Sequence, residues 1–406
     1  MSTGLRSRRA RPRRSRRFRN EVLGLAVISA SVVSGCGATH AAGPAAKISS
    51  PAIRALLATS IETSAGSWAI VAMGHLDQPL NTFWQLFFRP TGGALWSDRA
   101  AALAVATNGG LVVASPGGRF LVVGIRPSVD LEYSPLIVTS DARSWTSSGP
   151  LDALADEPDA LALASGGEAL ALVGDSRATR VLASPGGLAG WRQVASEHEL
   201  ATSDAGRACG IVSLTAVGYV GGQGLLGASC RRSGVVGVFA AHAGTWRLAG
   251  PSLPRSVGTS GTELLGLETT SRGLCALIAS VGRLSGDVVA ACTGTKALNW
   301  RVSPPLPLAR REGAISFGPA GGLGLYALVS GSARRDTLAV LGESDMTWRA
   351  LPRPPTGTAT VVFDPAGRVD ALSVADTSFT DWRLVGGATW RKVQGLYVAI
   401  QFGSSS

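Results

Sequence analysis

Residues Ala160–Val194 read ALALASGGEALALVGDSRATRVLASPGGLAGWRQV, and this stretch determines the fold class of the chain. Two apolar runs, Ala160–Ser165 and Glu168–Gly174, flank a Gly-Gly pair of the kind that forms tight turns. A polar loop, a third run at Arg180–Ser184 and a fourth segment beginning at Trp191 follow. Short apolar runs bounded by Gly, Ser and Asp are typical of β-strands. The stretch therefore predicts a unit of four short strands with a tryptophan on the last one.

The same unit recurs along the chain, because tryptophans mark its fourth strand at intervals of 49, 46, 55, 54, 48 and 42 residues. Periods of this length indicate repeat architectures, and four-stranded propeller blades are the all-β case. Seven blades of about 48 residues fit the 357 residues of Ser50–Ser406, although six or eight blades stay open. We therefore expect an all-β fold over residues 51–406, a seven-bladed β-propeller of four-stranded antiparallel blades. The marking residues are Trp96, Trp145, Trp191, Trp246, Trp300, Trp348 and Trp390.

The two ends of the chain leave two ways to close such a ring. Leu396–Phe402 forms one further apolar run, which we expect to complete the first blade beside Ser67–Gly74. Without this closure an exposed strand edge would remain on the terminal blade. The alternative is that Ala55–Thr63 supplies the inner strand of the first blade.

The amino-terminus has the pattern of an export signal. Nine arginines fall between Arg6 and Arg19, and the apolar stretch Val22–Gly35 is 14 residues long. That is shorter than the roughly 20 residues of a membrane span, but it fits the apolar core of a cleavable signal. It ends in Val33-Ser34-Gly35-Cys36, which resembles the lipobox of bacterial lipoproteins.

This resemblance implies that residues 1–35 are removed and that Cys36 carries the lipid, palmitate included. Residues 36–50, rich in small side chains, would then form a flexible tether to the extracytoplasmic face of the cell membrane. The alternative is an ordinary signal in which Cys36 is incidental. Arginine outnumbers lysine 35 to 3, which indicates a GC-rich genome and an actinobacterial source.

Net charge does not indicate nucleic-acid binding. The formal charge is +11, but residues 1–35 contain nine Arg and one Glu, so the mature chain is near +3. The basic character belongs mainly to the segment that is removed. We expect a monomer without a cofactor.

The four remaining cysteines suggest two disulfides, as an even number does in an exported protein. Cys209 and Cys230 lie symmetrically about Tyr219-Val220, and Cys275 and Cys292 lie symmetrically about Arg283-Leu284. Each pair can face across an antiparallel hairpin, so we predict the bridges Cys209–Cys230 and Cys275–Cys292; four free thiols are the alternative. We expect no metal site, since the chain has no CxxC, and we assign His198 to a solvated loop.

The segment Thr139–Trp145, TSDARSW, resembles the Asp-box, or BNR, repeat of sialidase-like propellers. Ser184–Trp191 is a second copy without the Asp, and Ser344–Trp348 is a third, shortened copy. In that family the Ser and Asp cap the turn between the third and fourth strands, and an aromatic residue packs between blades. The resemblance implies a structural role for these boxes and no catalytic one.

Sialidases add an arginine triad, a Tyr–Glu nucleophile pair and an acidic Asp. The segment nearest to their Phe-Arg-Ile-Pro signature is Phe88-Arg89-Pro90, which lacks one residue. Tyr133 is the one tyrosine in an open polar loop, near Asp130 and Glu132. We therefore assign no catalytic residue, and a sialidase-like glycoside hydrolase acting on envelope or host glycans is the alternative function.

A propeller has one face of short turns and one of longer loops. The turns after each first strand, such as Ser115–Gly118 and Pro319–Gly322, are short and read as structural. The longer loops, where binding residues usually lie, carry arginines in successive blades. Guanidinium groups around the ring would favour an anionic partner, although acidic residues in the same loops also allow local ion pairs. The candidate anion-binding residues are Arg126, Arg177, Arg231, Arg232, Arg283, Arg310, Arg311, Arg334 and Arg335.

These observations favour a non-catalytic binding or scaffold protein of the cell envelope, anchored by lipid and bound to an unknown protein or anionic glycan. The sequence offers no convincing nucleophile–base or metal constellation for the enzymatic alternative.

Overall fold

The computed structural model describes residues 53–55, 59–75, 81–103, 107, 109–125, 135–150, 157–174, 179–255, 257, 261–281, 287–296, 298–308, 313–330 and 336–399. All of them belong to one compact unit, Ile48–Ser406. In this part of the chain the strands are numbered β1–β29, and the helices are two short α-helices and one 3-10 turn, η2 (Ala100–Leu103). The prediction of an all-β fold is confirmed.

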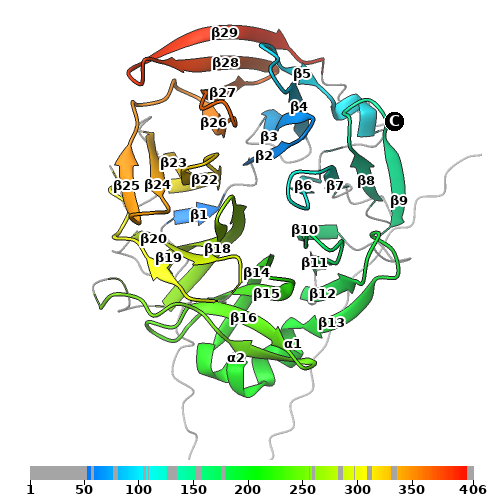
Figure 1. The fold of residues 1–406 in the computed structure, drawn as a ribbon, viewed down its shortest axis with the longest axis vertical. Helices are drawn as coiled ribbons and strands as arrows, with labels where there is room; N and C mark the ends of the chain where they lie inside the picture. Colours follow the sequence, from blue (N-terminus) through cyan, green and yellow to red (C-terminus); the bar gives the residue numbers. More distant parts are fainter. Residues whose placement is uncertain are drawn as a thin grey trace, which may run out of the picture. The chain divides into compact units, whose positions relative to one another are not determined.

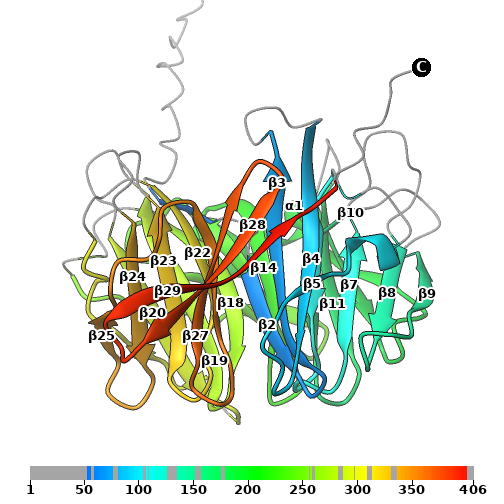
Figure 2. The ribbon, with the colours of Figure 1, turned by 90° about the horizontal axis from the view of Figure 1, so that it is seen from above.

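Consecutive strands pair antiparallel in sets of four. Four sheets hold one set each, and a fifth sheet adds β1 to a set. An eight-stranded sheet holds two sets, which meet at a single pair, Cys230 with Thr262. The described strands thus make seven sets, which we number 1 to 7 along the chain. Figure 1 shows them around a common axis, and their strands run roughly along that axis (Figure 2).

Set 1 has β2 (Thr59–Thr63), β3 (Gly66–Gly74), β4 (Thr82–Pro90) and β5 (Ser97–Asp98), and set 2 has β6 (Leu111–Ala114), β7 (Leu121–Ile125), β8 (Pro135–Thr139) and β9 (Thr146–Pro150). Set 3 has β10 (Glu157–Leu163), β11 (Ala169–Gly174), β12 (Thr179–Ser184) and β13 (Arg192–Ser196), and set 4 has β14 (Ile211–Val220), β15 (Gln223–Cys230), β16 (Gly237–His242) and β17 (Thr245–Leu248). Set 5 has β18 (Gly261–Thr270), β19 (Gly273–Val281), β20 (Val288–Gly294) and β21 (Arg301–Val302). Set 6 has β22 (Gly313–Pro319), β23 (Gly324–Ser330), β24 (Thr337–Gly342) and β25 (Thr347–Ala350). Set 7 has β26 (Thr358–Phe363), β27 (Val369–Ala375), β28 (Ser378–Val385) and β29 (Thr389–Tyr397).

The recurring tryptophans mark the fourth strand of each set, as the sequence predicts. Each of the seven lies in that strand or directly before it. Several indole N–H groups reach the preceding set: Trp300 donates to the carbonyl of Ala249 at 2.8 Å, and Trp390 to that of Pro352 at 3.2 Å. A tryptophan at this position therefore ties one set to the one before it.

Among the described residues the apolar core is divided into seven clusters, and each cluster joins two neighbouring sets. One of them joins the ends of the chain: Val71 and Phe87 of set 1 pack with Val362 and Phe379 of set 7. The Phe87 and Phe379 rings stack with centroids 4.1 Å apart. The sets therefore form a closed ring, because set 7 packs on set 1 as every other set packs on its neighbour.

The chain ends close this ring without exchanging a strand. The innermost strand of set 1 is β2, so the alternative that placed this strand within Ala55–Thr63 is the one observed. At the other end, β29 pairs only with β28, its own neighbour in set 7, and the expected strand beside Ser67–Gly74 is not found among the described residues. Residues 400–406, which include part of the predicted strand, lie outside the described residues.

Two short helices lie between sets 3 and 4, within the otherwise all-β fold. They are α1 (Glu197–Thr202) and α2 (Asp204–Cys209), and Ser196 and Ser203 cap their amino-termini by accepting backbone N–H groups. His198 therefore lies in the first turn of a helix and not in a loop. Both caps are Ser, and an acidic residue follows in each first turn, which is a typical start signal of a helix.

Both predicted disulfides are present. Cys275 and Cys292 are direct register partners on β19 and β20, with Cα atoms 4.1 Å apart. Cys209 and Cys230 are bridged with Cα atoms 5.0 Å apart, but Cys209 is the last residue of α2 and not a strand residue. The hairpin argument therefore holds for the second pair, whereas the first pair fastens a helix to the end of β15.

The expected export signal (1–35), Cys36 and the tether (36–50) lie outside the described residues. In the described part, we find no helix with the length and apolar character that crossing a membrane requires.

Candidate functional site

A cavity of about 650 Å³ lies on the ring axis, where the innermost strands reach their tight turns. All seven sets contribute to it, so it is the place where the whole ring converges. Its volume falls in the range of small-molecule sites. The lining comes from β2, β6, β10, β14, β18 and β22, from turns that follow these strands, and from the turn after β26. Its described residues are Ile61, Glu62, Val113–Ser115, Gly117, Gly118, Leu161–Leu163, Val217–Tyr219, Leu267–Ser271, Pro319, Gly321, Gly322 and Pro365.

The short strand β1 (Ile53–Ala55) lies at the other end of the axis. It runs parallel to β22, with Ile53 paired with Gly313 and Ala55 paired with Ile315. The cavity instead takes the last residue of β22, Pro319. The amino-terminal segment and the cavity therefore lie at opposite ends of the same inner strand.

Glu62, on β2, is one of two carboxyl groups in the lining. Its Oε2 accepts a hydrogen bond of 2.9 Å from the Ser67 hydroxyl, whereas its Oε1 is buried and has no hydrogen-bond partner. Burial raises the pKa of Glu62 to about 7, although Ser67 and the Arg89 charge act in the opposite direction. At neutral pH this carboxyl group is therefore close to half protonated.

Glu268, near the end of β18, is the other carboxyl group. Burial raises its pKa to about 8, so it is largely protonated at neutral pH. The phenol of Tyr219 lies in the same lining, and burial together with the Glu168 charge raises its pKa above the usual value. The cavity thus offers two carboxyl groups and one phenol in apolar walls.

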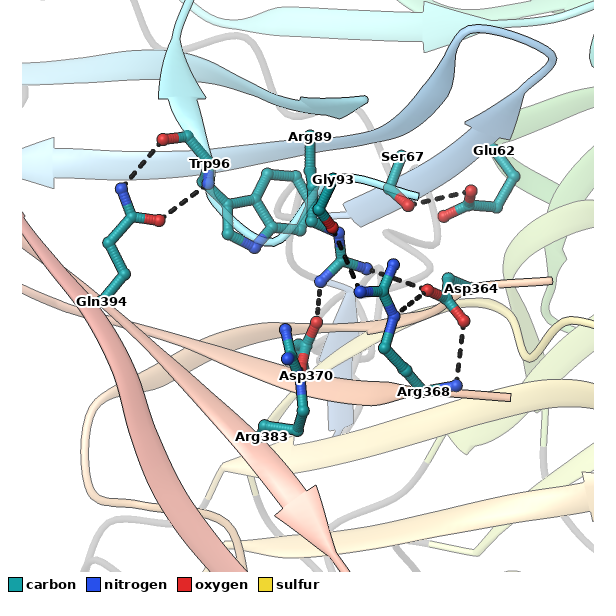
Figure 3. Close-up of polar contacts among 10 residues, drawn as sticks. All are labelled: Glu62, Ser67, Arg89, Gly93, Trp96, Asp364, Arg368, Asp370, Arg383 and Gln394. Carbon is teal, nitrogen blue, oxygen red and sulfur yellow. Dashed lines mark hydrogen bonds and ion pairs between the residues drawn. The ribbon is translucent and has the colours of Figure 1, made fainter. Parts of the chain in front are cut away.

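A second polar cluster, which we call the seam cluster, fills the junction between sets 1 and 7 (Figure 3). Arg89 on β4 is 1% exposed and forms ion pairs with Asp370 and, at 3.6 Å, with Asp364. Arg383 pairs with Asp370 at 2.9 Å, and Arg368 pairs with Asp364. These contacts join residues 281 positions apart in the sequence.

Burial and the neighbouring charges set the protonation of the seam cluster. Burial raises the pKa of Asp381 to about 6, although Arg89 and Arg383 lower it. Burial also opposes ionisation of Asp364, but hydrogen bonds and charge from Arg368 bring its pKa below the usual value. The pKa of Arg89 is lowered by burial and by the Arg368 charge. Asp364 therefore supplies a fixed negative charge, whereas Asp381 takes up a proton easily.

The backbone of Trp96 completes the junction. The Gln394 side chain accepts from the Trp96 N–H at 2.7 Å and donates to its carbonyl at 2.9 Å (Figure 3). The Arg89 guanidinium lies 4.8 Å from the centre of the Trp96 ring. Arg89, the arginine of the Phe-Arg-Pro segment, is thus buried and binds carboxylates of its own chain.

Of the nine predicted anion-binding arginines, only Arg231 and Arg232 are among the described residues. Both are exposed and directly follow β15. The Arg232 side chain donates to the Arg207 carbonyl at 2.9 Å, and its backbone N–H donates to the Cys209 carbonyl. Tyr133 also lies outside the described residues. An arginine-lined loop face therefore stays a prediction.

The segment that resembles an Asp-box forms a tight turn between β8 and β9. Asp141 Oδ1 accepts the N–H groups of Arg143 and Ser144, both at 2.8 Å, and these bonds lower its pKa to about 2. Ala142 has a φ of 61°, and Leu188 and Ala243 have similarly positive φ at the same distance before their tryptophans. The carboxylate thus stabilises a left-handed turn.

Among the described residues, Glu343, Cys275 and Cys292 form one group whose side-chain atoms lie close enough together to be potential metal ligands. Its Oε1 accepts from the Thr270 hydroxyl, and its Oε2 is buried without a partner. Both sulfur atoms are used in the disulfide, so the group holds no thiolate for a metal in this state.

The sequence reasoning missed Glu62 and Glu268. Each is a carboxylate near the end of a predicted innermost strand, and the strand of Glu268 also contains Glu263. Their position next to the tight turns that follow these strands is the sequence feature that could have indicated a site. Their convergence depends on the ring, which brings β2 and β18 together across more than 200 residues.

No family model and no curated protein sequence matches the chain. Its structure is similar to that of a GH74 xyloglucanase from Xanthomonas campestris, with a TM-score of 0.53 and 14% identity over 82% of this chain and 52% of the other. It is also similar to the BP39L lectin from Burkholderia pseudomallei, with a TM-score of 0.53 and 13% identity over 85% and 99%. The chain is a β-propeller.

A protein from Lactobacillus plantarum is similar to the propeller as well, with a TM-score of 0.51 and 11% identity over 82% and 96%. The propeller spans about half the length of the xyloglucanase. At these identities the likeness shows the fold alone, so any function has to be argued from the site.

Proposed function

We propose that this chain is a lipid-anchored, extracytoplasmic propeller of seven blades, one for each set, which binds a ligand in its central cavity without transforming it. The observation that carries the proposal is the cavity of about 650 Å³ to which all seven sets contribute. The arginine-rich start, the short apolar stretch and the lipobox-like Val33–Cys36 support export and anchoring at the cell membrane.

The chemistry of the lining favours binding over catalysis. The described lining residues include two carboxyl groups, a phenol and several hydroxyl groups in apolar walls, and no His, Cys or Lys. Such a set provides hydrogen bonds that orient a ligand, whereas a nucleophile needs an adjacent base within hydrogen-bond reach. The Asp-box resemblance fits this proposal, because Asp141 stabilises a turn.

Native mass spectrometry of the full chain, extracted from its host in mild detergent, tests ligand binding. Gly322 lines the cavity, and a Cβ built there meets nothing within 4 Å, so Gly322→Trp fills the cavity without a backbone clash. Gly294 has the same free space but lies outside the lining, so Gly294→Trp is the control. We expect a bound mass in the wild type and in Gly294→Trp that is lost in Gly322→Trp. A bound mass retained in Gly322→Trp contradicts the proposal.

Metabolic labelling with palmitate tests the anchor. We expect label in the wild type and none in Cys36→Ser, because the lipid would be attached to that thiol. Release of an unlabelled wild-type chain into the medium contradicts anchoring. Intact-cell cross-linking then tests the remaining part of the proposal, a protein or anionic glycan partner of a monomeric propeller at its arginine-containing loops.

One observation favours a second function, glycoside hydrolysis. Glycosidases use two carboxyl groups, of which the general acid has a raised pKa, and Glu62 and Glu268 share the cavity with raised pKa values. A fluorogenic sialoside and a fluorogenic xyloglucan oligosaccharide are the substrates to use. Hydrolysis that is lost in Glu268→Gln or Tyr133→Phe would establish the enzymatic alternative.

A further inference from the structure

The central cavity has a one-sided charge pattern in a chain that is basic overall. Residues 36–406 carry a formal net charge near +3, yet the ionisable residues of the described lining are Glu62, Glu268 and Tyr219. We infer that the cavity binds an organic cation, a ligand with a protonated amine on a compact hydrocarbon or aromatic body. This inference rests on the proposed function, since it assigns the ligand class of the same cavity.

The two carboxyl groups approach from different sides of the ring. Glu62 belongs to β2 in set 1 and Glu268 to β18 in set 5, and Figure 1 places these strands on opposing sides of the ring axis. Sets 2 to 4 separate them in one direction, and sets 6 and 7 in the other. Both residues belong to the cavity lining, and the Glu62 carboxyl group also accepts a hydrogen bond from Ser67 beside the seam cluster.

The walls between the carboxyl groups suit the body of such a ligand. Ile61, Val113, Leu161, Val217 and Leu267 line the cavity and keep its dielectric constant low. A charge in such surroundings is attracted strongly by an opposite charge and costs much to bury alone. Tyr219 adds an aromatic ring, whose face attracts ammonium groups.

Charges behind the lining do not change this pattern. Glu62 is followed outward by Arg89, Arg368 and Asp364, and these arginines pair with Asp364 and Asp370. Glu168 lies near Tyr219 and is also acidic. Three further cations belong to neighbouring segments. Arg272 directly follows the lining residue Ser271 and is exposed. The Arg119 side chain donates to the Pro116 and Ser165 carbonyls, and Arg54 lies on β1 opposite Ala314, toward the other end of β22.

Proton linkage distinguishes a cation from a neutral ligand. Glu62 and Glu268 have pKa values of about 7 and about 8, because burial disfavours their charged forms. An ammonium group favours the charged forms, so binding releases protons and strengthens as the pH rises through this range. A neutral sugar or alcohol has no such preference, and an anion has the opposite one.

Ligand titration by NMR, with three probes that share one ring, tests the inference on the full chain in detergent. The probes are benzylammonium, benzyl alcohol and benzoate. We expect benzylammonium to bind at least about tenfold more tightly than benzyl alcohol at pH 8.5, and at least about tenfold more tightly at pH 8.5 than at pH 6. Benzoate should show no binding at the cavity.

Two variant pairs assign the effect to the cavity. Glu268→Gln keeps the shape and removes the charge, so it should weaken benzylammonium binding at pH 8.5 at least about tenfold. Glu263→Gln, on the same strand but outside the lining, should not. Gly322→Trp should abolish binding and Gly294→Trp should preserve it, and all four variants should keep the thermal unfolding of the wild type.

The outcomes separate this inference from the proposed function. Equal binding of benzylammonium and benzyl alcohol, both blocked by Gly322→Trp, overturns the cation inference and leaves ligand binding in the cavity intact. The absence of any benzylammonium binding at pH 8.5 overturns it too. Loss of the native bound mass in Gly294→Trp as well as Gly322→Trp would instead count against the proposed function.

Discussion

The junction between sets 4 and 5 and the junction between sets 7 and 1 each hold two neighbouring sets together, but through different contacts. Between sets 4 and 5 the described residues meet through an apolar cluster, one main-chain pair and hydroxyl bonds such as that from Thr215 to the Leu264 carbonyl at 2.6 Å. Between sets 7 and 1 an apolar cluster is joined by the buried seam cluster around Arg89. The chain continues across the first junction and does not continue across the second.

The comparison teaches that the ends of this ring meet through contacts that tolerate little change. Apolar surfaces can slide and repack with modest loss, whereas a buried guanidinium needs its carboxylates in place. Arg89 contacts Asp364 and Asp370, which lie on either side of the turn before β27. The seam cluster therefore fixes the register of set 7 against set 1.

The largest effect is expected from Asp370→Ala. This change leaves Arg89 buried without its main partner, and the free energy of unfolding should fall by about 3 to 5 kcal/mol. The exposed pair of Asp204 with Arg207 is the control, and Asp204→Ala should cost about 1 kcal/mol or less. Urea denaturation measures both. Equal losses in the two variants would show that the seam cluster is not a special junction.

The next effect should come from the other half of the ring. Replacing both Cys275 and Cys292 by Ala removes the bridge between β19 and β20, and the free energy of unfolding should fall by about 2 to 4 kcal/mol. Urea denaturation of the wild type with and without a reductant provides a second measurement. If the free energy of unfolding did not fall, the stability of set 5 would depend on packing and main-chain hydrogen bonds and not on the disulfide.

A pH-dependent effect should distinguish two acids of the seam cluster. The pKa of Asp381 is raised to about 6, so its ionisation lowers the free energy of unfolding as the pH rises from about 4 to about 6. Asp381→Asn should remove this fall and stabilise the protein by roughly 1 to 3 kcal/mol at pH 8. The pKa of Asp364 is lowered, so Asp364→Asn should instead destabilise the protein above pH 4. Urea titrations at pH 4, 6 and 8 measure both, and the same sign for the two variants would contradict this assignment.

The smallest effect is expected from Trp300→Phe at the junction between sets 4 and 5. The change removes the indole bond to the Ala249 carbonyl but keeps an aromatic ring, so it should cost about 1 kcal/mol. Trp390→Phe, which removes the bond to Pro352, should cost the same. Thermal unfolding measures both, and a much larger loss in one variant would show that its tryptophan does more than join two sets.

The sequence predicts the repeated features of this molecule well and the contacts between distant repeats poorly. The marking tryptophans, the four strands of set 3 and the pair Cys275–Cys292 are local or periodic, so spacing predicts them. The helices α1 and α2 interrupt one repeat and follow no period. Arg89, Glu62 and Glu268 acquire their roles from partners in other sets, and no spacing within one repeat indicates those partners.

Synthesis from the amino-terminus gives the seam cluster a further consequence. Arg89 leaves the ribosome 281 residues before Asp370. For most of translation, set 1 therefore exposes a cationic side chain and the apolar surface that set 7 later covers. Those surfaces attract chaperones or other nascent chains until the final blade arrives. Deletion of the last blade should accordingly lower the yield of soluble protein more than its share of the chain suggests.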